Sequence, residues 1–145
     1  MTLSIKKKAT DYERALVNRF WEHGFAVMRA PSSSGTPMIP LPDIFAGSVE
    51  KGLFFAIELK TSKQEFFYVK KSQIEGLEEF AKRIGAYPIL GVKFIGKRMD
   101  FLFLPVPDAL TPSGGESYKV DINETIHKGI DFEILIKPET WEKKD

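Results

Sequence analysis

Asp43, Glu58 and Lys60 are the residues whose types and spacing point most directly to chemistry. Asp43 follows Pro42, and after fourteen further residues the sequence reads Glu58-Leu59-Lys60. Alternate side chains of an extended strand share a face, so Glu58 and Lys60 would project together, about 6.6 Å apart along the chain. If the strand that begins near Asp43 pairs antiparallel with this one, two carboxylates and an ammonium group meet.

Such a set of groups suits a hard divalent cation. Carboxylate oxygens without a soft donor favour Mg²⁺, with Mn²⁺ as a substitute, and Mg²⁺ also keeps several waters and binds substrate phosphate. Lys60 would hold or activate the attacking water, or neutralise charge on a transition state at phosphorus. The chain has no Cys, and its two His residues, His23 and His127, are isolated, which argues against a zinc site.

The same three residues also have a structural interpretation. Asp43 would then only open a strand, and Glu58 and Lys60 would form an exposed ion pair that contributes little to stability. However, Glu58 follows Phe-Phe-Ala-Ile in a predicted interior strand, where an unpaired carboxylate costs on the order of several kcal/mol. The functional interpretation is therefore favoured.

Apolar periodicity and turn residues predict an α/β fold with a mixed central β-sheet flanked by helices. Helices are expected over residues 10–22 and 72–84, each followed by Gly. Strands are expected over residues 25–30, 43–46, 53–59, 88–95 and 101–106, with the second and third antiparallel. Residues 31–42, rich in Pro and Ser, are expected to form a loop. Thr10 with Glu13, and Ser72 with Glu75, have the spacing of capping boxes.

Length and composition predict one domain over residues 1–145. The chain is 43% apolar and 12% aromatic, enough for a core without disulfides. The core is expected over about residues 9–107. Residues 108–145 form an acidic extension whose overall structure the sequence does not define. A strand at 118–122 and a short helix near 131–136 are expected within it. The absence of Cys and of any long apolar run favours a cytoplasmic protein without a membrane span.

The net charge of +1 hides an asymmetry. Residues 1–107 hold 16 Lys and Arg against 11 Asp and Glu, whereas residues 108–145 hold 5 against 9. The basic portion fits an anionic partner, although a solvated mixed surface is the ordinary explanation for any single cluster. The aromatic run Phe66-Phe67-Tyr68 fits either stacking on DNA bases or burial beneath the helix 72–84.

Pro42-Asp43 with Glu58-Leu59-Lys60 resembles the motif of the PD-(D/E)xK nuclease superfamily, which has a restriction-endonuclease-like core. Within it, the sequence is most similar to the archaeal Holliday junction resolvases. The similar segments are 12–17, 24–31, 41–46, 57–60 and 79–81, spread over about residues 9–95. Two departures are Ala9, where many relatives carry Gly, and Ile84, where some carry a second aromatic residue.

The resemblance implies roles for individual residues. Glu13, Asp43, Glu58 and the main-chain carbonyl of Leu59 would bind the metal, Lys60 would act on water or phosphate, and Ser33 would act near the scissile bond. DNA contacts are expected from the following residues: Arg14, Arg29, Lys6, Lys7, Lys8 and Gln73. Phe80 would make a dimer contact.

The implied activity is resolution of four-way DNA junctions during recombination and repair. Paired Mg²⁺-dependent hydrolysis by a homodimer would leave 5′-phosphate and 3′-hydroxyl ends, and association with a sliding clamp is left open. Two alternatives remain: another nuclease of the superfamily that acts on linear DNA, and a DNA-binding module without turnover.

Overall fold

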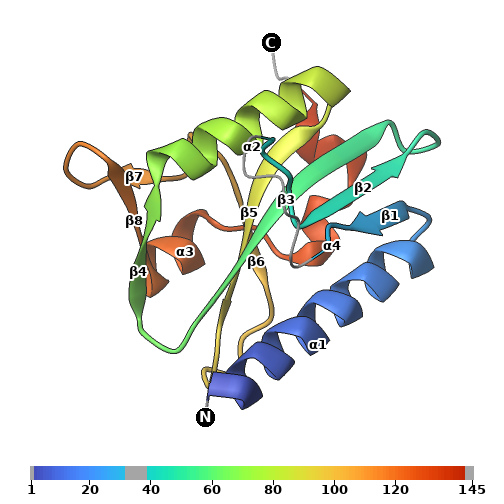
Figure 1. Cartoon of the computed structure of the whole chain (residues 1–145). Coiled ribbons are helices and arrows are strands. Elements are labelled where there is room, and N and C mark those ends of the chain that lie inside the picture. Colours follow the sequence, from blue (N-terminus) through green and yellow to red (C-terminus); the bar gives the residue numbers. More distant parts are fainter. Residues whose placement is uncertain (1, 32–38, 143–145) are drawn as a thin grey trace.

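The computed structural model describes residues 2–31 and 39–142, with side chains of the first helix described from Lys8 onward. The helices are α1 (Thr2–Glu22), α2 (Lys71–Ile84), α3 (Ile122–Lys128) and α4 (Phe132–Leu135), followed by the 3₁₀ helix η1 (Pro138–Trp141). The strands are β1 (Ala26–Arg29), β2 (Ile44–Ser48), β3 (Leu53–Ser62), β4 (Phe66–Lys70), β5 (Tyr87–Phe94), β6 (Leu102–Pro105), β7 (Thr111–Pro112) and β8 (Ser117–Asp121) (Figure 1).

Five strands form a mixed sheet in the order β1-β2-β3-β5-β6. β3 and β5 run parallel, and the other neighbouring pairs are antiparallel. The parallel pair needs a long crossover connection, which β4 and α2 provide. α2 lies over one face of this sheet, and α1 lies over the other (Figure 1). The predicted mixed sheet flanked by helices is confirmed.

Alternation along β3 divides the core into two layers. Phe55 packs in one layer with Phe20 of α1, whereas Ala56 packs in the other with Ile74 of α2. Glu58 comes two residues after Ala56 and therefore faces the α2 side of the sheet. The period of the strand thus directs this carboxylate to one particular face.

The acidic segment after residue 107 is folded over most of its length. β8 and α4 confirm the strand and the short helix expected there, while α3 was not predicted. Phe132 and Leu135 of α4 are buried in the same layer as Phe20, and Val120 of β8 is buried in the layer of Ile74. The segment therefore contributes side chains to both core layers.

The predicted start of the first helix and both predicted capping boxes are wrong. α1 begins at Thr2, so Thr10 and Glu13 lie inside the helix and do not form an N-terminal capping box. The Lys-rich start of α1 has no apolar stripe, which is why periodicity did not reveal it. α2 begins at Lys71 after the extended residue Lys70, which makes no side-chain cap, so the predicted Ser72–Glu75 capping box is absent.

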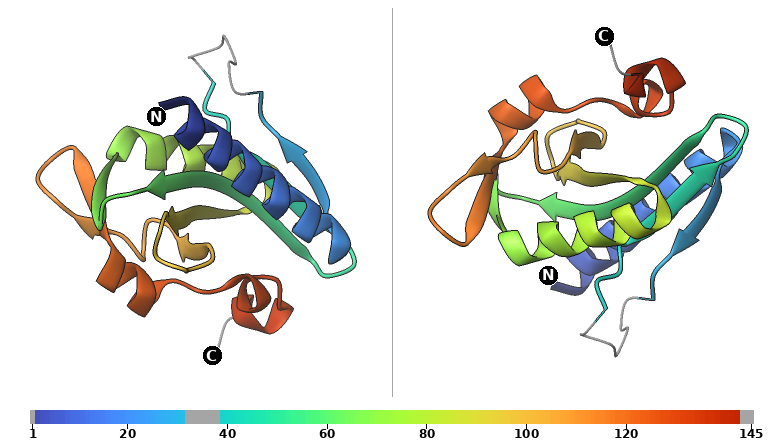
Figure 2. Two further views of the ribbon diagram at one scale, coloured as in Figure 1. Left: turned by 90° about the horizontal axis from the view of Figure 1, so that it is seen from below. Right: turned by 90° about the horizontal axis from the view of Figure 1, so that it is seen from above.

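A second sheet, of three strands in the order β4-β8-β7, was not predicted. β4 pairs antiparallel with β8, which lies about fifty positions later in the sequence, and β7 pairs with β8. This small sheet stands at one end of the molecule, next to the start of α2 (Figure 2). In the described part of the chain, no helix has the length and hydropathy needed to cross a membrane.

Candidate active site

The pairing of β2 with β3 positions the two predicted carboxylates. Ile44 lies opposite Ile57 in the register, so Asp43, just before β2, lies beside the end of β3 that carries Glu58. The main-chain amide of Leu59 donates a hydrogen bond to Asp43 Oδ2, at 2.7 Å. The predicted meeting of Asp43 and Glu58 is confirmed, and a backbone amide orients one of the two groups.

Lys60 completes this group on the same face of β3. Its Nζ lies 3.8 Å from Glu58 Oε2, and the two side chains are only 28% and 21% exposed. An ion pair this sheltered from water is screened less than one on an open surface. Lys60 is therefore positioned to act on a molecule that contacts Glu58.

Burial raises the pKa of both carboxyl groups, and the charge of a neighbouring carboxylate adds to the effect in each. Burial raises the pKa of Glu58 to about 7, the charge of Asp43 adds to the effect, and Lys60 opposes it. Burial also raises the pKa of Asp43, helped by the charge of Glu13 and opposed by the Leu59 amide. Two carboxylates in this environment resist being ionised together, and a bound cation would remove that conflict.

Glu13 faces the site from α1, but its partner is an arginine. Arg29 Nε of β1 donates to Glu13 Oε1 at 2.7 Å, and both side chains are partly buried. Within the described part of the chain, no three acidic, imidazole or thiol side chains form a group that could hold a metal ion. Glu13 thus lies close enough to raise the pKa values of Asp43 and Glu58, while its own carboxylate pairs with Arg29, and its role as a metal ligand stays a prediction.

A cavity of about 350 Å³ opens between β3 and the first turns of α2. Its lining residues are Pro40, Leu41, Glu58, Ser72, Gln73, Gly76 and Leu77. Gly76 permits the close approach that forms one wall, because a Cβ there would lie 2.8 Å from Pro40 Cβ. The segment that leads to Asp43 therefore packs directly on α2.

The donor set fits Mg²⁺. Two adjacent carboxylates, one with a pKa near neutrality, offer hard oxygen ligands and excess negative charge. The cavity beside Glu58 provides room for waters and a phosphate group. Asp43 and Glu58 are accordingly the residues that would hold the ion.

The other predicted residues are distributed around this centre. Gln73 lines the cavity, and Arg14 and Lys8 are exposed on α1. Lys6 and Lys7 belong to α1, but their side chains lie outside the described residues, as does the whole of Ser33. The main-chain amide of Leu59 donates to Asp43, and metal binding by its carbonyl stays a prediction.

Phe80 lies on a second, apolar surface. A cavity of about 370 Å³ is formed there by Met28, Arg29, Ala30, Pro31, Leu41, Pro42, Phe45, Phe80 and Ile84. Met28 is 71% exposed, an unusual exposure for a large apolar side chain on a strand. Arg29 and Pro42 border both this apolar surface and the acidic site.

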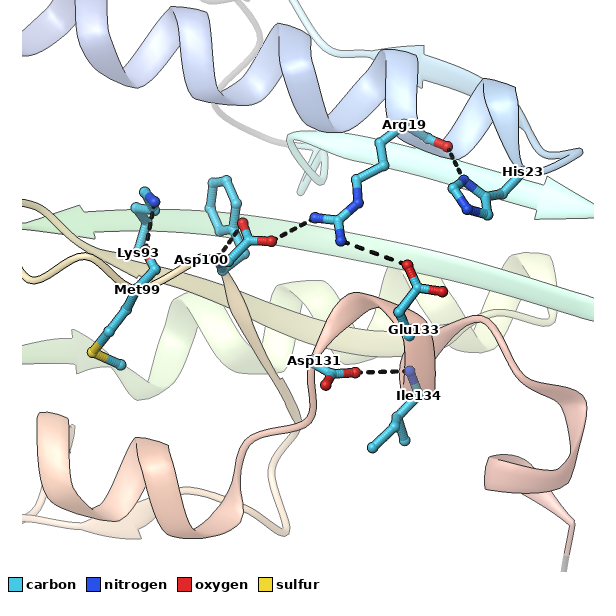
Figure 3. A network of polar contacts seen from close by, with 9 residues as sticks. Arg19, His23, Lys93, Met99, Asp100, Asp131, Glu133 and Ile134 are labelled. Atoms are coloured by element: carbon cyan, nitrogen blue, oxygen red, sulfur yellow. Dashed lines mark hydrogen bonds and ion pairs between the residues drawn. The ribbon is translucent and has the colours of Figure 1, made fainter.

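Arg19 was not identified from the sequence, yet it fixes the helix that carries Glu13. Its guanidinium donates to Asp100 Oδ2 at 2.6 Å and lies 3.7 Å from Glu133 Oε1 (Figure 3). The same group lies 4.3 Å from the ring centroid of Phe132. The network joins α1 to the segment before β6 and to α4, which are 81 or more positions distant in sequence, so no local pattern indicated it.

The raised pKa of Glu58 predicts a pH-dependent stability of the metal-free protein. Below about pH 4.5 the group is neutral in both the folded and unfolded states. As the pH rises towards 7, the unfolded chain loses this proton and the folded chain keeps it, so stability falls. Glu58→Gln is therefore expected to stabilise the protein at pH 8, by at most about 3 kcal/mol, and to have little effect near pH 4.5.

Thermal denaturation in EDTA at both pH values measures this difference. Glu22→Gln, at an exposed position near the end of α1, is the matched control. Equal melting temperatures of the Glu58→Gln and wild-type proteins at pH 8 would contradict the electrostatic description of the pair.

Comparison with known proteins gives one consistent result. Residues 4–143 match the family described as archaeal Holliday junction resolvase (Hjc). A protein named crossover junction endodeoxyribonuclease Hjc, from Sulfurisphaera tokodaii, is 38% identical over 135 residues, covering 92% of this chain and 89% of that protein. The protein of the same name from Sulfolobus acidocaldarius is 38% identical over 136 residues, with coverages of 93% and 90%. The solved structure of Archaeoglobus fulgidus Hjc, titled a Holliday junction resolvase, has a TM-score of 0.76 at 29% identity and covers 88% of this chain and 98% of that one.

Proposed function

We propose a function from one premise: the chain belongs to the archaeal Holliday junction resolvase family. Its fold is restriction-endonuclease-like, and its activity is the hydrolytic cutting of four-way DNA junctions by an endodeoxyribonuclease. The observation that carries a catalytic role is the buried pair Asp43 and Glu58, with Lys60 on the same face, beside an open cavity. A binding module without turnover has no need for two buried acids at such an electrostatic cost.

The residues divide the work of phosphodiester hydrolysis. Asp43 and Glu58 would hold Mg²⁺, or Mn²⁺ in its place, and the Leu59 amide keeps Asp43 oriented. When bound, Mg²⁺ supplies positive charge against the phosphate and makes water more acidic. Lys60 neutralises negative charge that develops on the scissile phosphate. Gln73, on the α2 side of the cavity, contacts the DNA backbone. Cutting leaves a 5′-phosphate and a 3′-hydroxyl.

One cleavage experiment tests this function against its closest alternative. A labelled four-way junction and linear duplexes with the same arm sequences are incubated with the protein in Mg²⁺ or in EDTA. Cutting of the junction alone, and only in Mg²⁺, is the expected result. Equal cutting of the duplexes would favour a nuclease for linear DNA, and cutting in EDTA would contradict the metal assignment.

A homodimer supplies the second incision. The described part of the chain holds one such acidic centre, whereas resolution needs cuts in two opposing strands. A two-fold pair of identical sites matches that need. The apolar surface around Phe80 supports this assembly, because Met28 and Ile84 are exposed there and a second copy would cover them. Arg29 and Pro42 border both this apolar surface and the acidic site, so a dimer formed through the surface would hold its two acidic sites close together.

Arg29 is expected to contribute to DNA binding as well as to the pairing with Glu13. Arg29→Ala should weaken junction binding and reduce the slope of log affinity against log salt by about 1, the value for one lost phosphate contact. Titrations of a fluorescent junction over a series of salt concentrations measure the slope. Lys137→Ala, at an exposed position beyond α4, is the control, and an unchanged slope for Arg29→Ala would remove Arg29 from the interface.

Other roles stay predictions that follow from the family. Ser33 would act near the scissile bond, and Arg14 with the three lysines of α1 would contact the DNA backbone. A cytoplasmic location and association with a sliding clamp also stay predictions.

A further inference from the structure

The small sheet presents aromatic rings to solvent on its outer face. Along β4 the side chains alternate: Phe67 packs inward, with its ring centroid 6.2 Å from that of Phe94, and Val69 is buried. Phe66 and Tyr68 point the other way and are 46% and 56% exposed. Of the aromatic run, Phe67 is turned toward the core, whereas Phe66 and Tyr68 face solvent, where stacking on DNA stays a prediction.

The two outer rings support each other and leave Tyr68 accessible. Their centroids are 5.9 Å apart and their planes are nearly perpendicular, at 85°. Among the described residues, the only aromatic ring in contact with that of Tyr68 is Phe66. The inner face of the small sheet already packs on the core. The exposed rings on its outer face are therefore not needed for that packing.

Positive charge lies on the same face. Lys119 of β8 is the register partner of Tyr68, and its Nζ lies 4.8 Å from the ring centroid of Phe66. Lys70 is exposed at the end of β4, on the same side as the two outer rings. Asp121, opposite Phe66, uses its carboxylate to cap α3. The face therefore combines exposed aromatic rings with two ammonium groups.

We propose that this face binds a short segment of unpaired DNA, an inference that rests on the proposed function because it extends the same substrate class. A base would stack on Tyr68, while Lys119 and Lys70 would contact the neighbouring phosphates. An unpaired strand fits better than a duplex, because a duplex turns phosphates and sugars outward and keeps its base faces stacked inside. Two lysines alone are too few to hold a duplex by counterion release.

The face is continuous with the candidate active site. β4 leads directly into α2, whose residues Ser72 and Gln73 line the cavity beside Glu58. A strand that leaves the cavity across the start of α2 would therefore meet Lys70 first and then Tyr68. Figure 1 shows β4 rising to the first turn of α2 at one side of the molecule.

Fluorescence anisotropy with a labelled oligothymidylate in EDTA tests the proposal. Tyr68→Ala is expected to weaken binding about 5- to 150-fold, the loss that corresponds to one base stacked on an aromatic ring. Tyr68→Phe keeps the ring and should bind as the wild type does, which separates stacking from any effect of the substitution on folding. Lys119→Gln should lower the salt slope.

Trp21→Ala is the matched control, because it removes an exposed aromatic ring near the far end of α1. Equal affinity of Tyr68→Ala and the wild type, or no binding of the oligothymidylate by the wild type, would overturn the proposal. The proposed function is tested separately by junction cutting in Mg²⁺. Failure of the outer face of the small sheet to bind DNA would therefore leave that result intact.

Discussion

Asp43→Asn is expected to reduce the rate of junction cutting in Mg²⁺ at least about a thousandfold while leaving junction affinity nearly unchanged. An amide keeps the shape of the side chain and can still face the Leu59 amide, but it removes the negative charge that would hold the cation. Glu58→Gln should have a similar effect, because Glu58 is the other buried carboxylate of the pair. DNA binding depends on other groups, so affinity should survive.

Single-turnover cleavage in Mg²⁺ and anisotropy titration in EDTA measure the two quantities separately. Asp108→Asn, at an exposed position after β6, controls for the loss of a carboxylate elsewhere. Mg²⁺ should also raise the melting temperature of the wild type but not of Asp43→Asn, because only a protein that binds the ion in its folded state is stabilised by it. Normal cutting by either site variant would show that the ligand assignment is wrong.

Phe80→Asp is expected to convert the proposed homodimer to a monomer and to separate the two incisions in time. A carboxylate in the apolar surface between Met28 and Ile84 would lose its hydration when a second copy covered that surface, at a cost on the order of several kcal/mol. Because Phe80 is only partly exposed, Ile84→Asp at the more exposed neighbouring position provides a second test with less risk to folding.

Sedimentation gives the oligomeric state, and a supercoiled plasmid with an extruded cruciform gives the coupling of the cuts. Paired cutting yields linear plasmid, whereas a single cut yields a nicked circle. Ile126→Asp on α3, also at an exposed apolar position, should keep the wild-type oligomeric state and product. If both surface variants sedimented as the wild type does, the apolar surface would not be the dimer interface.

The ion pair between Arg29 and Glu13 links DNA binding and metal binding, two properties that the sequence suggested separately. One residue was expected to contact DNA and the other to bind metal, but in this structure they bind each other at 2.7 Å. A phosphate that attracts Arg29 would compete with Glu13 for its guanidinium. The effect of Arg29→Ala on DNA binding therefore has to be measured in EDTA, where changes at the acidic centre do not contribute.

Local patterns in the sequence determined the fold class and the centre of the site. Alternation along residues 53–59 and the turn before them were enough to place Glu58 and Lys60 on one face, with Asp43 beside them, because strand period and antiparallel pairing are short-range rules. The apolar stripe of α2 and the glycine that ends the helix are also local signals, and they predicted this helix correctly.

Tertiary structure alone decided the contacts between distant elements. The pairing of β4 with β8 selected which rings of the aromatic run face solvent, and the packing of α1 brought Arg19 to Asp100 and Glu13 to Arg29. These contacts join residues between 16 and 81 positions apart and depend on how helices and sheets pack as bodies. Residue periodicity carries no information on that packing, because it describes only which face of an element is apolar and not which partner will cover it.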